Sequence, residues 1–305
     1  MLAIVIPYYK LLFFEKTLDS LSRQTDNRFK VYIGDDASPD DVRPLLEKFK
    51  NKINYSYYRF EDNVGKSSLV KQWQRCINLV EDAEWLMLLG DDDLLENNCI
   101  EAFYQHHEEV MLQNIKLIRF ATYKINEHSE VVSDAYVHPV LENVTKFLVR
   151  KFEGKTRSSL SEYIFSMENV IKRKFVEFPL AWHSDVFAVL EFSDFGPVFS
   201  INEAKVHIRI SPVSISGMTT NLVQKKKADA AFYSRLIDHL RVFEPKDQVK
   251  VLSHAEKFYI YNKKEIFLGL KIMLVYVFNF DGWALINFIR RILISFDEKY
   301  YAFRK

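Results

Sequence analysis

The chain has 305 residues, of which 48% are hydrophobic and 27% charged, so a packed core is expected and extended disorder is not. The formal net charge of +1 excludes the large basic excess of a general nucleic-acid binder, and we expect no nucleic-acid partner. The length suits one large α/β domain with an appendage, or two ordinary domains.

Strand-like and helix-like patterns alternate from the start of the chain to about residue 125. Apolar runs predict the strands, and apolar residues at helical spacing predict the helices between them. The expected strands cover residues 2–7, 30–36, 53–60, 84–90 and 116–125, and the expected helices cover residues 11–21, 40–50, 67–81 and 99–113. Such alternation is typical of βαβ units with right-handed crossovers, and therefore of a mostly parallel sheet flanked by helices.

Three of the expected strands end in polar residues, namely Tyr8–Tyr9–Lys10, Asp35–Asp36 and Asp91–Asp92–Asp93. In open α/β sheets, ligands bind outside the carboxyl ends of the strands. Adjacent strands would bring these three ends together. We therefore expect a cleft there.

The acidic triplet Asp91–Asp93 has two interpretations. Hard cations such as Mg²⁺ and Mn²⁺ take carboxylate oxygens and often keep substrate phosphates as further ligands, so the triplet suits a metal site for a diphosphate. Equally, acidic residues are stabilised at the start of a helix by its dipole, and such a helix would begin near Leu94. The triplet alone favours neither interpretation.

The second acidic strand end, residues 34–41, also has two interpretations. Ser38 or Asp40 would cap the following helix in an ordinary Asp-rich turn. Capping does not require Asp35 and Asp36, which precede the turn. A carboxylate at either position suits hydrogen bonds from a ribose or from the N–H of a pyrimidine.

The rest of the chain departs from this alternation. Residues 126–217 are expected to be rich in loops and to face the acceptor. After Gly217, residues 223–243, 246–270 and 271–296 have helical patterns, none of which has the roughly 20 uncharged residues of a spanning helix. These helices either complete the core as a small bundle or attach to an anionic membrane surface through Lys225–Lys227, Arg290 and Arg291.

The cellular compartment is suggested by the cysteines and the N-terminus. Only Cys76 and Cys99 occur, without a secreted-type framework, so a reducing cytosol is the expected compartment. The stretch MLAIVIPYYK has no basic region and no small-residue cleavage site, which favours a first strand over a signal peptide.

Residues His106–Glu109 are expected to form a solvated helix face and not a metal site.

Four stretches together resemble the nucleotide-binding half of the family-2 glycosyltransferases, which have the GT-A fold. They are AIVIPYYK, VYIGDDASPDD, NVGKSSLVKQWQRC and EWLMLLGDDD, and their order and spacing match over roughly the first 125 residues. The resemblance implies a GT-A domain at residues 1–217, with a nucleotide-sugar half at 1–125, an acceptor-facing half at 126–217 and a helical extension at 218–305. It also implies a nucleoside-diphosphate sugar donor, most often a uridine one, and usually inversion at the anomeric carbon.

The resemblance assigns roles in the nucleotide pocket by position. Pro7 and Tyr8 would form its base, Asp36 would contact the nucleobase, and Asp35 would support that loop. The segment that lines the nucleotide and its phosphates would include Gly65 and Arg75.

The resemblance also assigns roles in the acidic triplet. Asp92 would face the ribose or the metal, and Asp93 would be the principal ligand of Mg²⁺ or Mn²⁺. Gly90 stands where the family often has Asp, and Asp91 would compensate. Two further departures change the pocket rim, because Tyr8 replaces a common Thr or Ser and Lys10 replaces a common Asn.

The second half resembles the family more weakly. Asp185, ahead of an apolar helix, would be the base that takes the acceptor proton, although an Asp there is also an ordinary cap. A neighbouring His183 would lie in the acceptor pocket or simply on a loop. In VHIRISPVSISG, the resemblance implies phosphate contacts from Arg209 and His207 and hydrogen bonds from Ser214 and Ser216; the alternative is a strand with outward polar residues.

The expected function is a metal-dependent, inverting glycosyltransferase of bacterial surface-polysaccharide or lipopolysaccharide synthesis. Its partners would be a nucleotide-sugar donor, a glycan or lipid-linked acceptor, and an anionic membrane surface at the cytoplasmic face. One alternative is a non-catalytic relative that binds sugar nucleotides or scaffolds a membrane assembly. A metal-dependent phosphatase is disfavoured, because its nucleophilic Asp commonly follows the first strand and VIPYYK has none.

Overall fold

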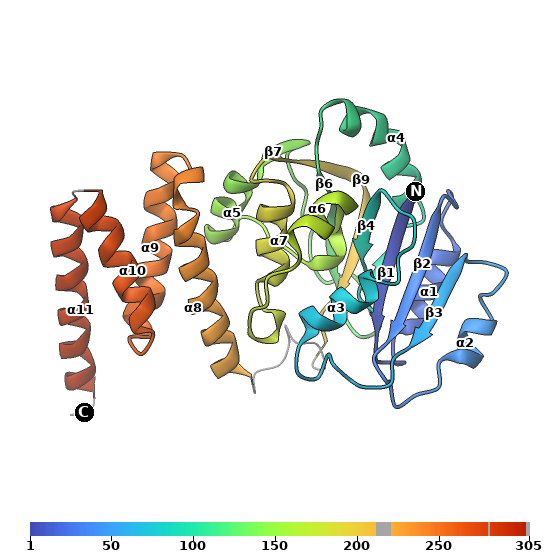
Figure 1. The fold of residues 1–305 in the computed structure, drawn as a ribbon, viewed down its shortest axis with the longest axis horizontal. Coiled ribbons are helices and arrows are strands. Elements are labelled where there is room, and N and C mark those ends of the chain that lie inside the picture. The colour runs from blue at the N-terminus through green and yellow to red at the C-terminus, as the bar shows by residue number, and fades with distance from the viewer. Residues whose placement is uncertain (212–220, 280, 303–305) are drawn as a thin grey trace. The chain divides into compact units, whose positions relative to one another are not determined.

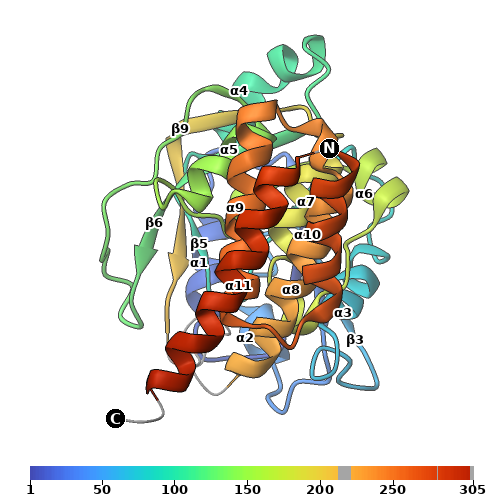
Figure 2. The same ribbon diagram turned by 90° about the vertical axis from the view of Figure 1, so that its left-hand side faces the viewer.

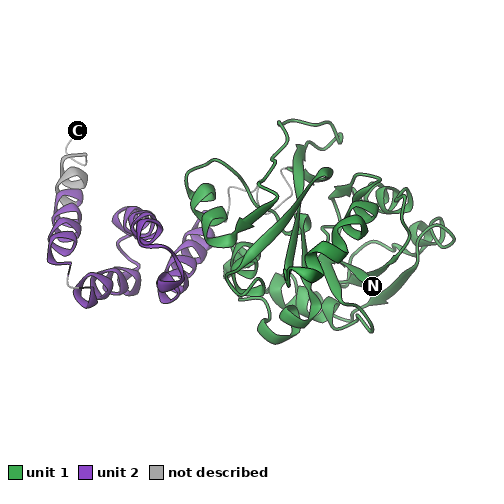
Figure 3. Ribbon diagram, turned by 90° about the horizontal axis from the view of Figure 1, so that it is seen from above, with its two compact units in different colours: residues 1–221 green, residues 222–305 purple. Residues whose placement is uncertain are grey.

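The computed structural model describes residues 1–211, 221–279 and 281–302, with side chains to residue 295. The chain forms two compact units, unit 1 (residues 1–221) and unit 2 (residues 222–305), which Figure 3 distinguishes by colour. The boundary expected from the sequence, between residues 217 and 218, lies outside the described residues.

Unit 1 is built on one mixed sheet (Figure 1). Its strands are β1 (Leu2–Tyr8), β2 (Phe29–Asp35), β3 (Tyr55–Arg59), β4 (Trp85–Leu88), β5 (Leu94–Leu95), β6 (Leu117–Ile125), β7 (Leu141–Asn143), β8 (Tyr163–Ser166) and β9 (Pro197–Arg209). Their order is β3-β2-β1-β4-β8-β6-β9-β5, with β7 beside β9. The five strands expected before residue 125 are confirmed as β1, β2, β3, β4 and β6.

The sheet is mostly parallel, as expected. β1 pairs in parallel with β2 and β4, and β2 pairs in parallel with β3. β8 runs against this direction, since it lies between β4 and β6 and is antiparallel to both. β6 therefore points the same way as β4, and β9 pairs in parallel with β6. The short strands β5 and β7 also run against this direction, since each is antiparallel to β9.

Helices cover both faces of the sheet. Those of unit 1 are α1 (Phe14–Ser22), α2 (Arg43–Glu47), α3 (Leu69–Ile77), α4 (Cys99–Leu112), α5 (Val144–Phe152), α6 (Met167–Arg173) and α7 (Ser184–Phe192). α1, α2 and α4 share one hydrophobic core with alternate residues of β1. On the other face, rings of α3, β8 and α7 meet around Phe175. Strands buried on both faces explain the continuous apolar runs in the sequence.

Strand register brings the expected polar ends together. Tyr8 at the end of β1 is paired with Asp35 at the end of β2. On its other side, Val5 of β1 pairs with Leu88, the last residue of β4, so that residues 89–93 continue beyond the sheet edge next to Tyr9. The expected cleft therefore lies over β1, β2 and β4, where the strand order requires it to be.

The expectation of a loop-rich segment after residue 126 is wrong. This segment contains α5, β8, α6, α7 and the thirteen-residue β9. Its elements are short and follow one another closely; β8 ends at Ser166 and α6 begins at Met167. The helices α5, α6 and α7 have nine residues or fewer and β8 has four, so each gives a short window in which a period of 3.6 or 2 is hard to recognise. Only β9 is long enough for a clear pattern among these five elements.

Unit 2 is helical, as expected. Its helices are α8 (Leu222–Asp238), α9 (Pro245–Tyr261), α10 (Ile266–Phe278) and α11 (Gly282–Ala302), which are labelled in Figure 2. Within the unit, Lys271 donates to Asp238 at 2.7 Å and joins α10 to α8, while Tyr276 donates to Glu256 and joins α10 to α9. Among the described residues, no helix is long and apolar enough to cross a membrane.

Candidate active site

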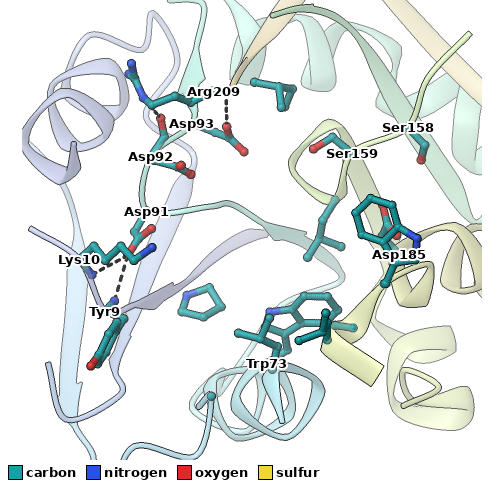
Figure 4. Close-up of a pocket in the computed structure, with 18 of the residues that line it drawn as sticks. Tyr9, Lys10, Trp73, Asp91, Asp92, Asp93, Ser158, Ser159, Asp185 and Arg209 are labelled. Atoms are coloured by element: carbon teal, nitrogen blue, oxygen red, sulfur yellow. Dashed lines mark hydrogen bonds between the residues drawn. The ribbon is translucent and has the colours of Figure 1, made fainter. Parts of the chain in front are cut away.

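A cavity of about 950 Å³ lies over the carboxyl ends of β1, β2 and β4. One wall, here called the strand-end wall, consists of Tyr9, Lys10 and Asp91–Asp93. The facing wall, here called the loop wall, consists of residues 157–160 and 180–186. Figure 4 shows Asp91, Asp92 and Asp93 on one side of the cavity, Ser158, Ser159 and Asp185 on the other, and Trp73 of α3 at its base.

Most residues predicted from the sequence meet at this cavity. It is lined by Pro7, Asp36, Gly65, Asp91, Asp92, Asp93, Asp185 and Arg209. Tyr8 lies behind this lining. It is fully buried and packs against Phe14, and burial raises the pKa of its hydroxyl to about 12. The phenol therefore remains neutral, and its expected place at the base of the nucleotide pocket stays a prediction.

Asp91 joins two strand ends. Its Oδ2 accepts backbone N–H groups of Tyr9 and Lys10, each at 2.9 Å. A carboxylate in this position fixes the chain that leaves β1 against the chain that leaves β4. Burial raises the pKa of Asp91, and the two N–H donors oppose this effect.

Asp93 is held by the second half of the chain. Its side chain is only 6% exposed, Oδ2 accepts the hydroxyl of Ser161 at 2.5 Å, and Oδ1 accepts the backbone N–H of Arg209 at 2.8 Å. Burial raises its pKa, while these donors lower it. Ser161 also accepts the N–H of Gly90 at 2.9 Å, so one hydroxyl ties together both ends of the acidic loop.

Asp92 differs from its two neighbours. No described residue donates a hydrogen bond to its carboxylate, although the side chain is only partly exposed. Burial, followed by the nearby charges of Asp93 and Asp91, raises its pKa to about 8. Among the three acidic residues, Asp92 is therefore the one whose carboxylate receives no hydrogen bond from the described residues.

Gly90 has a specific steric role beside these carboxylates. A Cβ at this position would lie 3.0 Å from Oδ2 of Asp93 and 3.1 Å from Oδ1 of Asp92. An aspartate at position 90 would crowd the carboxylates as they are arranged here. The same distances show that one oxygen of each side chain approaches a common point.

The geometry of the acidic loop fits a shared metal site. Two carboxylates with converging oxygens, one lacking any hydrogen-bond donor, match the oxygen ligands that Mg²⁺ and Mn²⁺ prefer. Within the described part of the chain, no group of three or more His, Cys, Asp or Glu side chains is arranged to hold a metal ion. Two carboxylates would supply only part of the oxygen ligands that such a cation takes.

Asp35 and Asp36 organise the nucleotide side of the cavity. Asp35 is fully buried, accepts the hydroxyl of Tyr57 at 2.6 Å and pairs with Arg59 at 2.8 Å. Asp36 accepts the N–H groups of Val64 at 2.8 Å and Gly65 at 2.9 Å. Both carboxylates fix loops around the cavity, and contact of Asp36 with a nucleobase stays a prediction.

Arg75 does not line the cavity. Its guanidinium pairs with Asp36 and with Asp62, the latter at 2.9 Å, and lies over the ring of Phe60. It acts on the site through Asp36. The expected caps of the second helix are also wrong: α2 begins after Val42 without a side-chain cap, and Ser38 instead donates to the carbonyl of Tyr9 at 2.8 Å.

Arg209 is buried, and its guanidinium holds backbone carbonyls in place. Its guanidinium donates to the carbonyls of Asp92 at 2.9 Å and Asn126 at 2.6 Å, and the residue is 2% exposed. His207, the other cation expected near phosphate, lies outside the lining and contacts Glu96 at 3.4 Å. The predicted donors Ser214 and Ser216 lie outside the described residues.

Asp185 is presented by unusual backbone. It sits in the first turn of α7, and its flank contains three non-glycine residues with positive φ: Leu180 (60°), Ala181 (53°) and His183 (72°). No described residue donates a hydrogen bond to the Asp185 carboxylate. Backbone of this kind costs free energy and persists only where the surrounding structure fixes it, which is frequent at active sites.

Sequence reasoning missed several residues of the site. Ser161 and Trp73 show no local motif, since a lone serine and an aromatic on a helix face are both common. Glu162 follows Ser161, is fully buried and accepts the backbone N–H of Ser159 at 3.1 Å, and burial raises its pKa to about 7. Arg157, Ser158 and Ser159 line the loop wall. For the residues between 157 and 162, the one signal in the sequence was a run of polar side chains between two apolar segments.

Comparison with known proteins agrees with this architecture. The model of the family described as glycosyl transferase family 2 matches residues 3–167, more than half of the chain. The chain is 25% identical over 126 residues to poly(ribitol-phosphate) beta-N-acetylglucosaminyltransferase TarS of Staphylococcus aureus, in strains Mu50 and MW2. That match covers 37% of this chain and 21% of TarS, so the chain spans about a fifth of the length of the curated relatives it matches.

Solved structures share the fold. A crystal structure of S. aureus TarS aligns with a TM-score of 0.61 at 13% identity, covering 85% of this chain and 43% of the other. A shorter TarS chain in complex with UDP-GlcNAc aligns with a TM-score of 0.59 at 15% identity, covering 98% and 92%. At these identities the likeness concerns the fold, which is GT-A as expected. The match over residues 3–167, on a GT-A sheet whose strand ends carry the acidic loop, shows that this chain belongs to glycosyl transferase family 2.

Proposed function

We propose that this enzyme transfers a sugar, with inversion, from a UDP-linked donor to a hydroxyl group of its acceptor, and that it needs Mg²⁺ or Mn²⁺. The observation that carries the proposal is the pair of walls. An acidic loop with an uncompensated Asp92 faces, across one cavity, a carboxylate on a helix start.

Asp92 and Asp93 are the proposed metal ligands. Asp92 is ready to bind, because no described residue donates to it, and Asp93 is held in place by Ser161 and Arg209. When bound, the cation acts as a Lewis acid that offsets the charge developing on the leaving diphosphate. Pro7, Asp36 and Gly65 line the nucleotide side of the cavity, and Asp91 keeps the two strand ends together.

Asp185 is the proposed general base. It would accept the proton of the acceptor hydroxyl as that oxygen attacks the anomeric carbon. Its place on the loop wall, opposite the acidic strand-end wall, supports attack from the side away from the leaving group, which inverts the anomeric centre. The unoccupied hydrogen-bonding capacity of the carboxylate supports this role.

The relatives suggest which donor to test first. TarS is named a beta-N-acetylglucosaminyltransferase, and one of its structures is described as a complex with UDP-GlcNAc. UDP-GlcNAc is therefore the first candidate donor. For the acceptor, we propose a glycan or lipid-linked molecule of bacterial surface-polysaccharide synthesis, with residues 1–217 as the transferase domain.

Metal-dependent donor hydrolysis tests this proposal without knowledge of the acceptor. UDP-GlcNAc, UDP-glucose, UDP-galactose and GDP-mannose would each be incubated with the protein, with Mn²⁺ and then with EDTA. We expect UDP release from at least one UDP-sugar only with metal, and calorimetric UDP binding that also needs metal. UDP binding of equal strength in EDTA would refute the metal dependence, and binding without hydrolysis or transfer would favour a non-catalytic relative.

We also propose that residues 218–305 attach the enzyme to an anionic membrane surface at the cytoplasmic face. α10 and α11 expose large apolar side chains, including Phe267 (84% exposed) and Trp283 (75% exposed). Arg290 on α11 has no ion-pair partner among the described residues. Apolar and basic groups on one short helical unit suit a lipid interface.

Vesicle sedimentation tests the attachment. The protein should sediment with vesicles rich in phosphatidylglycerol and not with pure phosphatidylcholine, and the double substitution Phe267→Ala, Trp283→Ala should release it. Leu112→Ala, which removes an equally exposed apolar residue of α4, is the matched control. Equal release by the control would refute a specific role for α10 and α11.

A further inference from the structure

One basic side chain stands among the carboxylates of the strand-end wall. Lys10 lies just after the end of β1, and its backbone N–H donates to Oδ2 of Asp91 at 2.9 Å. That bond fixes the main chain of Lys10 against the acidic loop, while the residue itself is exposed and lines the cavity. Figure 4 shows Lys10 beside Asp91, on the same side of the cavity as Asp92 and Asp93. The lysine side chain therefore starts from a fixed point next to the proposed metal ligands.

The charge of Lys10 reaches two carboxylates of the acidic loop. Burial raises the pKa of Asp91, and burial together with the neighbouring carboxylates raises that of Asp92 to about 8. The positive charge of Lys10 opposes the rise at both residues. Because such an effect weakens with distance, the ammonium group is near enough to attract an anion that is held at Asp92.

Arg209, another cation whose charge acts on Asp92, is already committed to the protein. Its buried guanidinium donates to the carbonyls of Asp92 and Asn126 and holds that backbone. Lys10 instead carries a compact ammonium group with three donors on a flexible stem, which adapts to phosphate oxygens. Since Lys10 replaces an Asn that is common in the family, the family pattern does not supply its role.

From this arrangement we propose that Lys10 binds the diphosphate of the donor and stabilises it as it leaves. The proposal rests on the function proposed above and adds a residue to its donor site. In the transfer step, the bond between the anomeric carbon and the β-phosphate oxygen breaks, and its electron pair stays on that oxygen. The acceptor oxygen bonds to the carbon and loses its proton to Asp185. Negative charge thus grows on the diphosphate, where a cation held in advance stabilises it.

The alternative role for Lys10 is to offset the charge of the acidic loop, and Lys10→Gln separates the two roles by the sign of its effect. A lysine that binds the diphosphate predicts that UDP affinity in Mn²⁺ falls about tenfold, as for loss of a charged hydrogen bond. Uridine, which has no phosphate, should bind as before. A lysine that only offsets the acids predicts tighter Mn²⁺ binding in the variant and UDP affinity that is equal or higher.

Calorimetry with Mn²⁺ and UDP and ligand-observed NMR with uridine measure these affinities on one preparation. Unchanged or higher UDP affinity in Lys10→Gln would overturn the proposal, and so would an equal loss of uridine affinity. Lys71→Gln, which removes an exposed lysine of α3 outside the cavity lining, is the matched control and should bind UDP normally. A loss in this control as large as that in Lys10→Gln would also overturn the proposal.

Turnover gives a second readout. Hydrolysis of the donor at saturating concentration should fall about tenfold in Lys10→Gln, because the lost charge acts where negative charge develops. Absence of UDP binding in the unsubstituted protein would refute the proposed function itself. Metal-dependent UDP binding and hydrolysis that do not change in Lys10→Gln would overturn only the role of Lys10.

Discussion

The two walls of the cavity are built on different principles. The strand-end wall gets its carboxylates from residues that closely follow the buried strand β4, and backbone N–H groups at the end of the neighbouring strand β1 hold one of them, Asp91. The loop wall gets Asp185 from a segment with three positive-φ residues and its serines from a loop after α5. The first wall is a consequence of sheet geometry, while the second depends on irregular backbone that packing must hold in place.

The largest expected effect concerns the loop wall. Asp185→Asn keeps the size and position of the side chain but removes the base, so turnover should fall by roughly 10²–10⁴-fold. UDP affinity should not change, because the strand-end wall is untouched. Single-turnover rates and calorimetry on the same preparation measure both quantities. Normal turnover would show that another group is the base, and that proton transfer does not belong to the loop wall.

The next effect concerns the strand-end wall. Asp92→Asn removes the carboxylate that has no donor, and metal-dependent UDP affinity should fall about 100-fold or more, since loss of an outer-shell partner of a ligand already costs roughly 10–100-fold. Asp93→Asn should weaken it as well, since Asp93 is the second proposed ligand. Calorimetry with and without Mn²⁺ distinguishes the two. An Asp92 variant that binds UDP and Mn²⁺ normally would leave Asp93 as the principal ligand.

A smaller effect on stability is expected from Glu162, which lies at the junction of the walls. Burial raises its pKa from 4.5 to about 7, so between these values the folded protein binds more protons than the unfolded chain. Its contribution to the free energy of unfolding is therefore fully present below about pH 4.5, falls as the pH rises, and levels off above pH 7. Glu162→Gln removes this loss, so the variant should gain on the unsubstituted protein by about 3 kcal/mol at most between about pH 5 and 8. Urea unfolding of both proteins at about pH 5 and pH 8 measures this gain in the free energy of unfolding. A difference between the two proteins that does not change with pH would contradict the raised pKa of Glu162.

The smallest effect concerns the contact that joins the walls. Ser161→Ala removes the hydroxyl that donates to Asp93 and accepts from Gly90, which should cost about 1 kcal/mol of stability and lower turnover about tenfold. Ser161→Thr keeps the hydroxyl and should restore turnover if the added methyl group is accommodated. A fall in stability alone, with turnover unchanged, would reduce Ser161 to a purely structural contact.

Much of the strand-end wall could be predicted from the sequence. Parallel strands buried on both faces have continuous apolar sequences, and their polar ends must meet where the strands are adjacent. The positions of Asp36 and Asp91–Asp93 at the ends of such strands therefore suffice to place them at one cavity. Their individual roles could not be predicted, because whether a carboxylate receives donors depends on residues far along the chain, such as Ser161 and Arg209 for Asp93.

The amino-acid pattern was enough to predict the alternating α/β architecture, the acidic residues at strand ends, and the helical character of the chain after residue 217. These follow from hydrophobic periodicity, which is local. The folded structure was needed to show that Arg75 braces Asp36 and lies outside the cavity, and that Asp92 alone among the acidic triplet lacks a donor from the described residues. It was also needed to show that Ser161 and Arg209 hold Asp93. Charge pairing depends on distances between segments that are far apart in sequence, and the folded arrangement alone fixes those distances.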